Sequence, residues 1–122
     1  MKPTEQPRNY LFIINDSPYG SARAYHALRL AVNLAKRPDC HVRVFLVGDG
    51  TMCALAGQQP AEGMYNMEHM ISAIVHHGEV ATSGMGAETR GLKPKAMIDG
   101  VKAAPMDTLA EWTVTAEHVL VF

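Results

Sequence analysis

The sequence predicts a single α/β domain of three layers, α/β/α, around a mainly parallel sheet of about five strands. Its 122 residues match the usual size of one domain. Short apolar runs alternate along the chain with stretches of helical periodicity. The links between them are short and rich in glycine, proline, asparagine and aspartate, an order typical of parallel sheets covered by helices on both faces. We assign residues 1–9 to an N-terminal tail and residues 10–122 to the domain.

The first half of the chain contains two predicted strands and a long helix. Residues 10–14 are apolar, with aromatic and β-branched side chains, and a cluster of turn formers follows them. Ser21 is a suitable N-cap for a helix whose apolar residues recur every three or four positions until Pro38 ends it. Residues 41–47 then predict a second strand, and residues 51–56 a short helix.

The second half begins with the clearest amphipathic helix, for which Asn66 is the expected N-cap and Gly78 the expected C-cap. Residues 79–82 form a weak third strand. Glycine and proline mark the segment from there to Gly100, where we expect a loop with one or two helical turns and any functional site. The remaining elements are a short strand at residues 101–103, a helix with Pro105 at its first position, and a terminal strand at residues 118–122.

Composition excludes several classes of function. The formal net charge is -1, and 19% of the residues are charged. Without a basic excess we expect no direct contact with nucleic acid. No apolar run approaches the roughly 20 residues needed to cross a bilayer, and the N-terminal residues lack the apolar stretch of a signal peptide, so we expect a cytoplasmic protein without membrane contact. Two cysteines are too few for a disulfide framework.

Short segments along almost the whole chain carry a resemblance to a known family. They include Pro18-Tyr19-Gly20-Ser21, Leu28-Arg29-Leu30-Ala31, Gly48-Asp49, Tyr65-Asn66, Arg90-Gly91, Ile98-Asp99-Gly100-Val101 and Trp112-Thr113. Each is weak as a motif. Their order and spacing together resemble the DsrE/DsrF-like family, in particular its small YchN-like members, over residues 10–122.

The resemblance implies a flavodoxin-like three-layer fold, assembly into homotrimers or homohexamers, and partners that hand sulfur along an intracellular relay. In active members a persulfide-carrying cysteine follows the third strand, often as Cys-x-x-Cys shortly before Arg-Gly. Counted back from Arg90 and Gly91, these positions hold Ser83 and Gly86. A serine hydroxyl cannot hold a persulfide, so we expect an accessory or non-catalytic member rather than an enzyme.

The turn after the third strand also predicts an alternative function. The backbone donors of Ser83, Gly84, Met85 and Gly86, with Arg90 as counter-charge, could bind a small anion or metabolite. The structural alternative is a turn in which Ser83 caps a short helix. A separate alternative for the whole protein is a structural subunit of an oligomeric complex. A nucleophilic role for Ser83 would need a histidine or acidic partner, which the sequence does not identify.

The link after the first strand holds two further candidates, Asp16 and Tyr19. It lacks the spacing of a nucleotide-binding loop, and the resemblance assigns it to the rim of the pocket and to subunit contacts. Cys53 is the candidate thiol, because it follows the second strand on the side where parallel sheets bind ligands. A small buried side chain is the usual alternative for a lone cysteine.

We predict no metal and no cofactor. Three histidines share one helix, but no carboxylate completes a metal-binding set, and histidines in a last turn suit the helix dipole. The eight methionines are expected to fill the core and interfaces rather than bind copper. The first helix is apolar beyond its core stripe, which fits burial in a subunit interface; the residues concerned are Tyr25, Leu30 and Val32.

Overall fold

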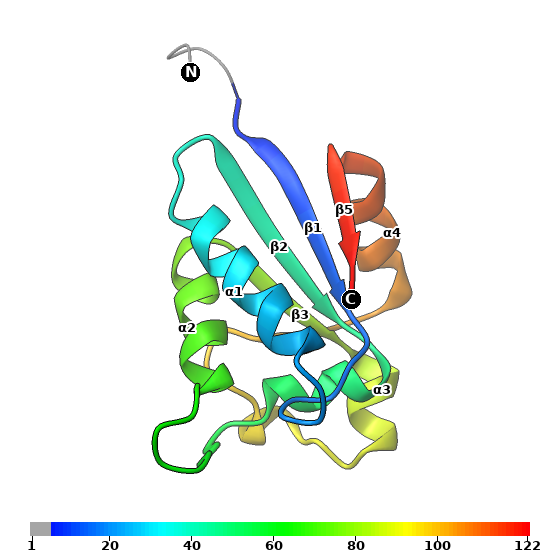
Figure 1. Ribbon diagram of the computed structural model, residues 1–122. Coiled ribbons are helices and arrows are strands. Elements are labelled where there is room, and N and C mark those ends of the chain that lie inside the picture. Colours follow the sequence, from blue (N-terminus) through cyan, green and yellow to red (C-terminus); the bar gives the residue numbers. More distant parts are fainter. Residues whose placement is uncertain (1–5) are drawn as a thin grey trace.

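The computed structural model describes residues 6–122 and contains a five-stranded parallel sheet in the order β4-β3-β2-β1-β5 (Figure 1). The α/β class predicted from the sequence is therefore confirmed. The strands are β1 (Arg8–Ile14), β2 (Cys40–Leu46), β3 (Glu79–Ser83), β4 (Lys102–Ala104) and β5 (His118–Val121).

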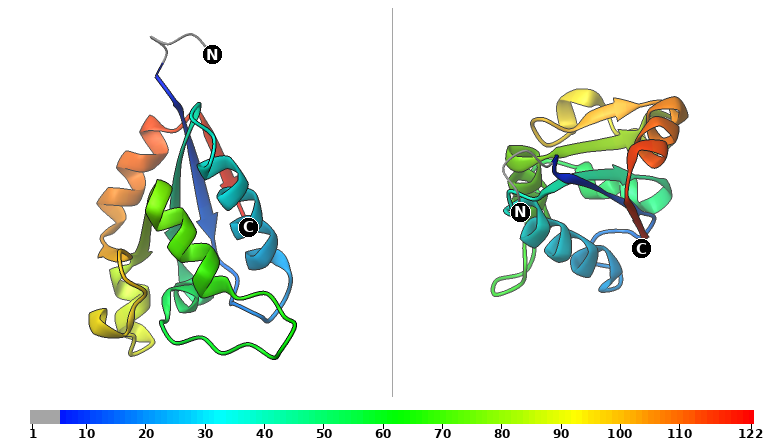
Figure 2. Two further views of the ribbon diagram at one scale, coloured as in Figure 1. Left: turned by 90° about the vertical axis from the view of Figure 1, so that its left-hand side faces the viewer. Right: turned by 90° about the horizontal axis from the view of Figure 1, so that it is seen from above.

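One face of the sheet is covered by α1 (Arg23–Ala35) and α2 (Met67–His77), which lie side by side (Figures 1 and 2). Their apolar stripes meet the inward-facing side chains of the central strands and form the main core. Its largest fully buried members include Phe12, Ile14, Leu28, Met67, Ile71 and Ile74. The helical periodicity seen in the sequence therefore identified the correct face of each helix.

The opposite face is covered by α4 (Met106–Thr115), which leads from β4 at one edge of the sheet to β5 at the other (Figure 2). Trp112 packs edge-on against Phe45, with 5.8 Å between the ring centroids. Leu11 and Ala81 complete this smaller core. No residue of α4 is fully buried, so one helix leaves parts of this face uncovered.

The ends of α2 follow the sequence prediction. The Asn66 side chain accepts hydrogen bonds from two backbone N–H groups of the first turn, those of Glu68 and His69. Gly78 ends the helix, but its φ of -150° is not left-handed. A Cβ atom at Gly78 would lie 2.2 Å from the carbonyl oxygen of Val42, so glycine is required by the close approach of β2.

The prediction of Ser21 as the N-cap of α1 is wrong. Ala22 occupies that position and makes no side-chain hydrogen bond. The Ser21 hydroxyl instead donates to the Asp16 carboxylate and accepts from the N–H of Arg23 at 3.3 Å. The Ser21 hydroxyl therefore binds a carboxylate of the preceding loop and does not cap the helix.

Three short helices gather at the carboxyl end of the sheet: η1 (Gly48–Ala54), α3 (Gly84–Thr89) and η2 (Pro94–Ala96). β1 begins at Arg8, two residues before the expected start of the domain, and residues 1–5 of the expected tail lie outside the described residues. Within residues 6–122, every helix is too short or too polar to span a membrane.

Candidate functional site

A crevice opens at the carboxyl end of the sheet, between β3 and β4. The helices that follow β1 and β2 pack on one face, whereas α4 follows β4 on the other (Figure 2). Parallel sheets place ligand sites where the chain changes faces in this way. The crevice has a volume of about 580 Å³ and is lined by Ser83, Gly84, Met85, Glu88, Ala103, Ala104, Pro105 and Met106.

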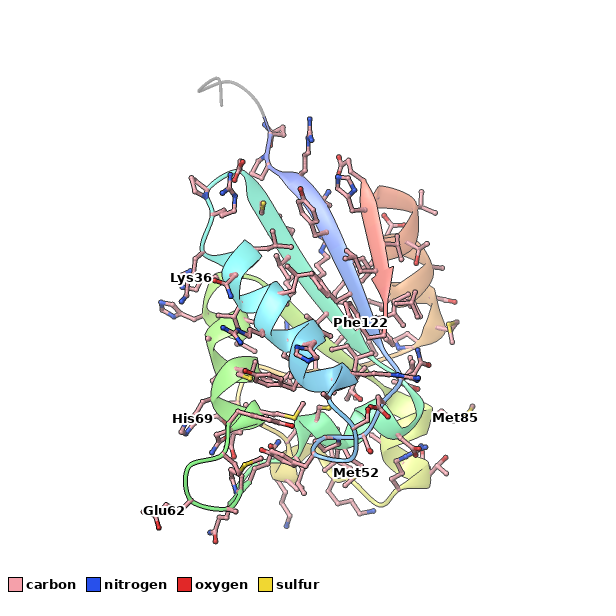
Figure 3. The ribbon with its side chains drawn as sticks, in the orientation of Figure 1. Lys36, Met52, Glu62, His69, Met85 and Phe122 are labelled. Atoms are coloured by element: carbon pink, nitrogen blue, oxygen red, sulfur yellow. The ribbon has the colours of Figure 1, made fainter. Side chains whose placement is uncertain are left out.

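Three of the residues predicted from the sequence lie together here: Ser83, Gly84 and Met85. The walls are mainly apolar. Met85 is 79% exposed and Met106 is 66% exposed, and Figure 3 shows Met85 projecting from α3 at the margin of the molecule. Sequence reasoning missed Met106 as a lining residue, because an apolar residue at the start of a helix indicated only that its side chain packs against the core.

Ser83 is the last residue of β3 and the N-cap of α3. Its Oγ accepts a hydrogen bond from the N–H of Gly86 at 3.0 Å, as expected for a cap. The single titratable side chain in the crevice lining is Glu88, and no hydrogen bond joins it to Ser83 in the described chain. Among residues 6–122 no base contacts this hydroxyl, so it retains the weak nucleophilicity of an ordinary alcohol.

Arg90 already has partners. Its guanidinium donates to the carbonyl oxygen of Gly86 at 3.2 Å and to the carboxylate of Asp49 at 3.0 Å. The Arg90 side chain is 28% exposed and that of Asp49 is 74% exposed, so the ion pair contributes only about 0–1 kcal/mol. An anion at this turn would have to displace Asp49, and the anion-binding role of Ser83, Gly86 and Arg90 stays a prediction.

A buried hydroxyl that the sequence did not signal lies beneath the turn. Thr51, in η1, is fully buried, and its Oγ1 has no hydrogen-bond partner among the described residues. A Cβ atom added to Gly86 would lie 2.8 Å from this oxygen and 3.3 Å from the Cβ of Ser83. Thr51 therefore keeps position 86 closed to larger side chains. Positions 51 and 86 are distant in sequence, so only the folded chain reveals this contact.

Replacing Thr51 by valine is expected to raise the free energy of unfolding by about 1 kcal/mol. The methyl group has nearly the shape of the hydroxyl and removes the penalty of a buried polar atom without a partner. Chemical denaturation of both proteins measures the difference. Thr82→Val is the comparison, because Thr82 is equally buried but its Oγ1 lies 3.5 Å from the carbonyl oxygen of Leu46. A loss of stability in Thr51→Val would contradict this account of the hydroxyl.

The structure does not bring Asp16 and Tyr19 into the crevice. The Tyr19 hydroxyl donates to the side chain of Gln58 at 2.6 Å and accepts from the N–H of Met67 at 3.0 Å, which ties the loop to the start of α2. Tyr19 borders a separate cavity of about 270 Å³, whose other lining residues are Pro18, Met52, Leu55, Gln58, Gln59 and Pro60. Asp16 binds the Ser21 hydroxyl. These contacts hold the loop in place.

Neither cysteine is among the residues that line the crevice. Cys53 is fully buried, and its S–H points to the carbonyl oxygen of Asp16 at 3.8 Å. Burial, together with the charge of Asp16, raises the pKa of the Cys53 thiol to about 12. Cys40 is partly buried and is the first residue of β2, at the opposite end of the sheet. The placement of Cys53 does not support its role as a reactive thiol.

The histidines of α2 are not part of a metal centre in the described chain. His76 and His77 occupy the last turn, and their rings meet edge to face with 4.9 Å between centroids. Among residues 6–122, no group of three or more histidine, cysteine, aspartate or glutamate side chains is placed to hold a metal ion.

The fold and the crevice define a small parallel α/β protein with a hydroxyl, rather than a thiol, at the turn after the third strand of its chain. The chain belongs to the DsrE/DsrF-like family, whose model matches residues 8–122. This finding confirms the resemblance inferred from the sequence.

Relatives of known sequence and structure agree with this assignment. The chain is 33% identical to the protein YchN of Escherichia coli K12 over 114 residues, which cover 92% of this chain and 97% of that protein. The crystal structure of YchN matches with a TM-score of 0.88, covering 94% of this chain and 99% of the other. The chain is also 27% identical to a sulfurtransferase TusD homolog of Vibrio vulnificus over 128 residues, covering 93% of this chain and 96% of that protein.

Proposed function

We propose that this protein is an accessory, non-catalytic member of its family that works with sulfur-relay proteins in the cytoplasm. The observation that carries the proposal is the Ser83 hydroxyl in the crevice, at the position where the family resemblance puts the sulfur-carrying cysteine. Transfer of a sulfane sulfur needs a thiolate acceptor, which an alcohol cannot replace. The relationship to a sulfurtransferase TusD homolog supports the relay context.

The proposal also rests on the placement of the remaining sulfur atoms. Cys53 would need to ionise before it could attack a persulfide, and its raised pKa of about 12 opposes ionisation near neutral pH. The methionine thioethers at the crevice rim cannot form a persulfide, because each sulfur already carries two carbon substituents. The crevice can then serve as a contact surface for a relay protein but not as a carrier of sulfur.

Incubation with a small persulfide donor is expected to leave Cys53 unmodified between about pH 7 and about pH 9, because the buried thiol remains protonated. Intact-mass measurement followed by peptide mapping gives the result. A Cys40→Ser variant removes the background from the partly buried thiol, and unfolded protein serves as the positive control for Cys53. A stable adduct on Cys53 of the folded protein would show that carrier chemistry survives at this position.

We also propose that the protein is a homo-oligomer, as a trimer or a hexamer. Support comes from exposed apolar side chains on the edge strand β5 and near the end of α4: Val119 is 43% exposed, Val121 is 64% exposed and Val114 of α4 is 82% exposed. An edge strand with open backbone groups and apolar side chains favours association with another chain. Tyr25, Leu30 and Val32 were expected in an interface. Tyr25 stacks on Tyr65 and Val32 packs against the core, whereas Leu30 is 39% exposed, so its place in an interface stays a prediction.

Light scattering coupled to size exclusion is expected to give a mass several times that of the 13.3 kDa chain. Val121→Glu should shift the distribution toward the single chain, because burying an unpaired carboxylate in an apolar contact is costly. Met64→Glu is the matched control, since Met64 is 56% exposed and lies in the loop before α2, outside β5. A single-chain mass for the unmodified protein would refute this proposal.

A further inference from the structure

A third cavity lies beside α4, toward the opposite end of β3 from Ser83. Its volume is about 370 Å³, within the range of small-molecule sites. Val75, Val80 and Trp112 contribute apolar walls, and Thr108, Glu79 and Lys102 contribute polar groups. None of these residues lines the Ser83 crevice, although the two cavities share Ala103, Ala104 and Pro105.

The cavity arises from the shortness of β4 and from two glycines beside it. β4 is three residues long and pairs with β3 only from Ala81 to Ser83, so the start of β3 has no strand beside it on this side. Gly78 and Gly100 line the gap without adding side chains. Gly100 has a φ of +90°, which side chains disfavour, and a Cβ at Gly78 would lie too close to the backbone of β2. The short β4 and these two glycines thus leave the space unfilled.

Two charged side chains line the cavity, Glu79 and Lys102, and they differ in whether another side chain neutralises them. Strand alternation and the pairing of Ala81 with Lys102 put Glu79, Ala81 and Lys102 on the α4 face of the sheet. The Oε2 atom of Glu79 accepts from Arg43 at 2.7 Å and lies 3.0 Å from the His41 ring. Partial burial opposes ionisation of Glu79, but these two hydrogen bonds outweigh it and lower the pKa of the carboxyl group.

The negative charge of Glu79 is therefore balanced by Arg43, which also lies over the Trp112 ring at 5.4 Å. Lys102 has no ion-pair or hydrogen-bond partner for its ammonium group within residues 6–122. The cavity consequently combines an aromatic and aliphatic wall with one uncompensated positive charge.

We propose that this cavity binds a small carboxylic acid with a planar apolar body, which packs against Trp112 while its carboxylate pairs with Lys102. A planar ring offers the contact area that the Trp112 wall can accept. A carboxylate supplies the charge that Lys102 lacks, and charge-assisted hydrogen bonds are among the stronger polar contacts in proteins. Cationic rings are disfavoured, because Arg43 already neutralises Glu79.

The chain contains a single tryptophan, so Trp112 fluorescence reports directly on this cavity. Titration of the purified protein with phenylacetate is expected to give a saturable change in emission. Phenylacetamide and phenethylamine, which share the ring but not the negative charge, are expected to bind at least about tenfold more weakly.

Lys102→Gln is expected to weaken phenylacetate binding about tenfold without changing the melting temperature, because Lys102 is exposed and its ammonium group makes no ion pair or hydrogen bond within residues 6–122. Lys95→Gln is the matched control, since Lys95 is also exposed but does not line this cavity. The proposal is overturned if phenylacetate gives no saturable change, if the amide or amine binds as well, or if Lys102→Gln and Lys95→Gln behave alike. Sulfur-transfer assays do not enter this test, so its outcome is independent of the accessory role proposed above.

Discussion

A Ser83→Cys variant is expected to take up one sulfur atom from a persulfide donor, whereas the unmodified protein takes up none at this position. The new thiol would stand in the crevice lining, where position 83 is partly exposed. It would also replace an oxygen that accepts the N–H of Gly86 at 3.0 Å, and the same donor can stabilise a thiolate or persulfide anion. The attacking thiolate receives the sulfane sulfur, and the donor leaves as its thiol.

The experiment is best performed in a Cys40→Ser background, so that position 83 holds the one reactive thiol. Intact mass before and after incubation gives the extent of modification, and treatment with a reductant should reverse it. Ser83→Ala in the same background is the matched control and should remain unmodified. If Ser83→Cys reacts with an alkylating agent but not with the persulfide donor, the crevice does not support persulfide chemistry. The serine at position 83 would then not be the reason that the unmodified protein carries no sulfur there.

Gly50→Ala is expected to lower the free energy of unfolding by about 3 kcal/mol or more, with a fall in melting temperature of roughly 10 °C. The added Cβ atom would lie 2.1 Å from the carbonyl oxygen of Ile14 and 2.8 Å from its carbonyl carbon. Both atoms belong to the backbone of the interior strand β1, so neither can move without disturbing the sheet. The N–H of Gly50 also donates to the carbonyl oxygens of Asn15 and Val47.

Gly84→Ala is the matched control for this prediction. A Cβ atom there would lie 3.7 Å from the carbonyl oxygen of Ala104, an ordinary contact, and alanine favours the first turn of α3. Thermal and chemical denaturation should show Gly84→Ala within about 1 kcal/mol of the unmodified protein. Equal effects of the two substitutions would show that the approach of η1 to β1 is looser than the structure indicates.

Local sequence patterns were sufficient to predict most of the strands and helices and the fold class. The apolar runs of β1 and β2 and the stripe of α2 depend on neighbouring residues only, so they could be identified before the tertiary structure was known. The Asn66 cap was identified for the same reason. The Ser21 cap was not, because its hydroxyl had a competing acceptor at Asp16 in the preceding loop.

The candidate site was only partly accessible from the sequence. Counting from Arg90 placed Ser83 at the turn after β3, and the structure puts it in the crevice lining. Asp16 and Tyr19 were grouped with it because the family resemblance assigned their loop to the rim of the pocket. Their side chains instead bind partners of their own, such as Gln58 for Tyr19.

The amino-acid sequence by itself determined the α/β class, the family resemblance and the lack of a cysteine at position 83, because each depends on residue type, spacing or local periodicity. Only the tertiary structure decided that Cys53 is enclosed, that Arg90 pairs with Asp49 and that Thr51 faces Gly86. These properties arise from contacts between segments far apart in the chain. Such contacts form when the strands take their order in the sheet, and no local pattern encodes them.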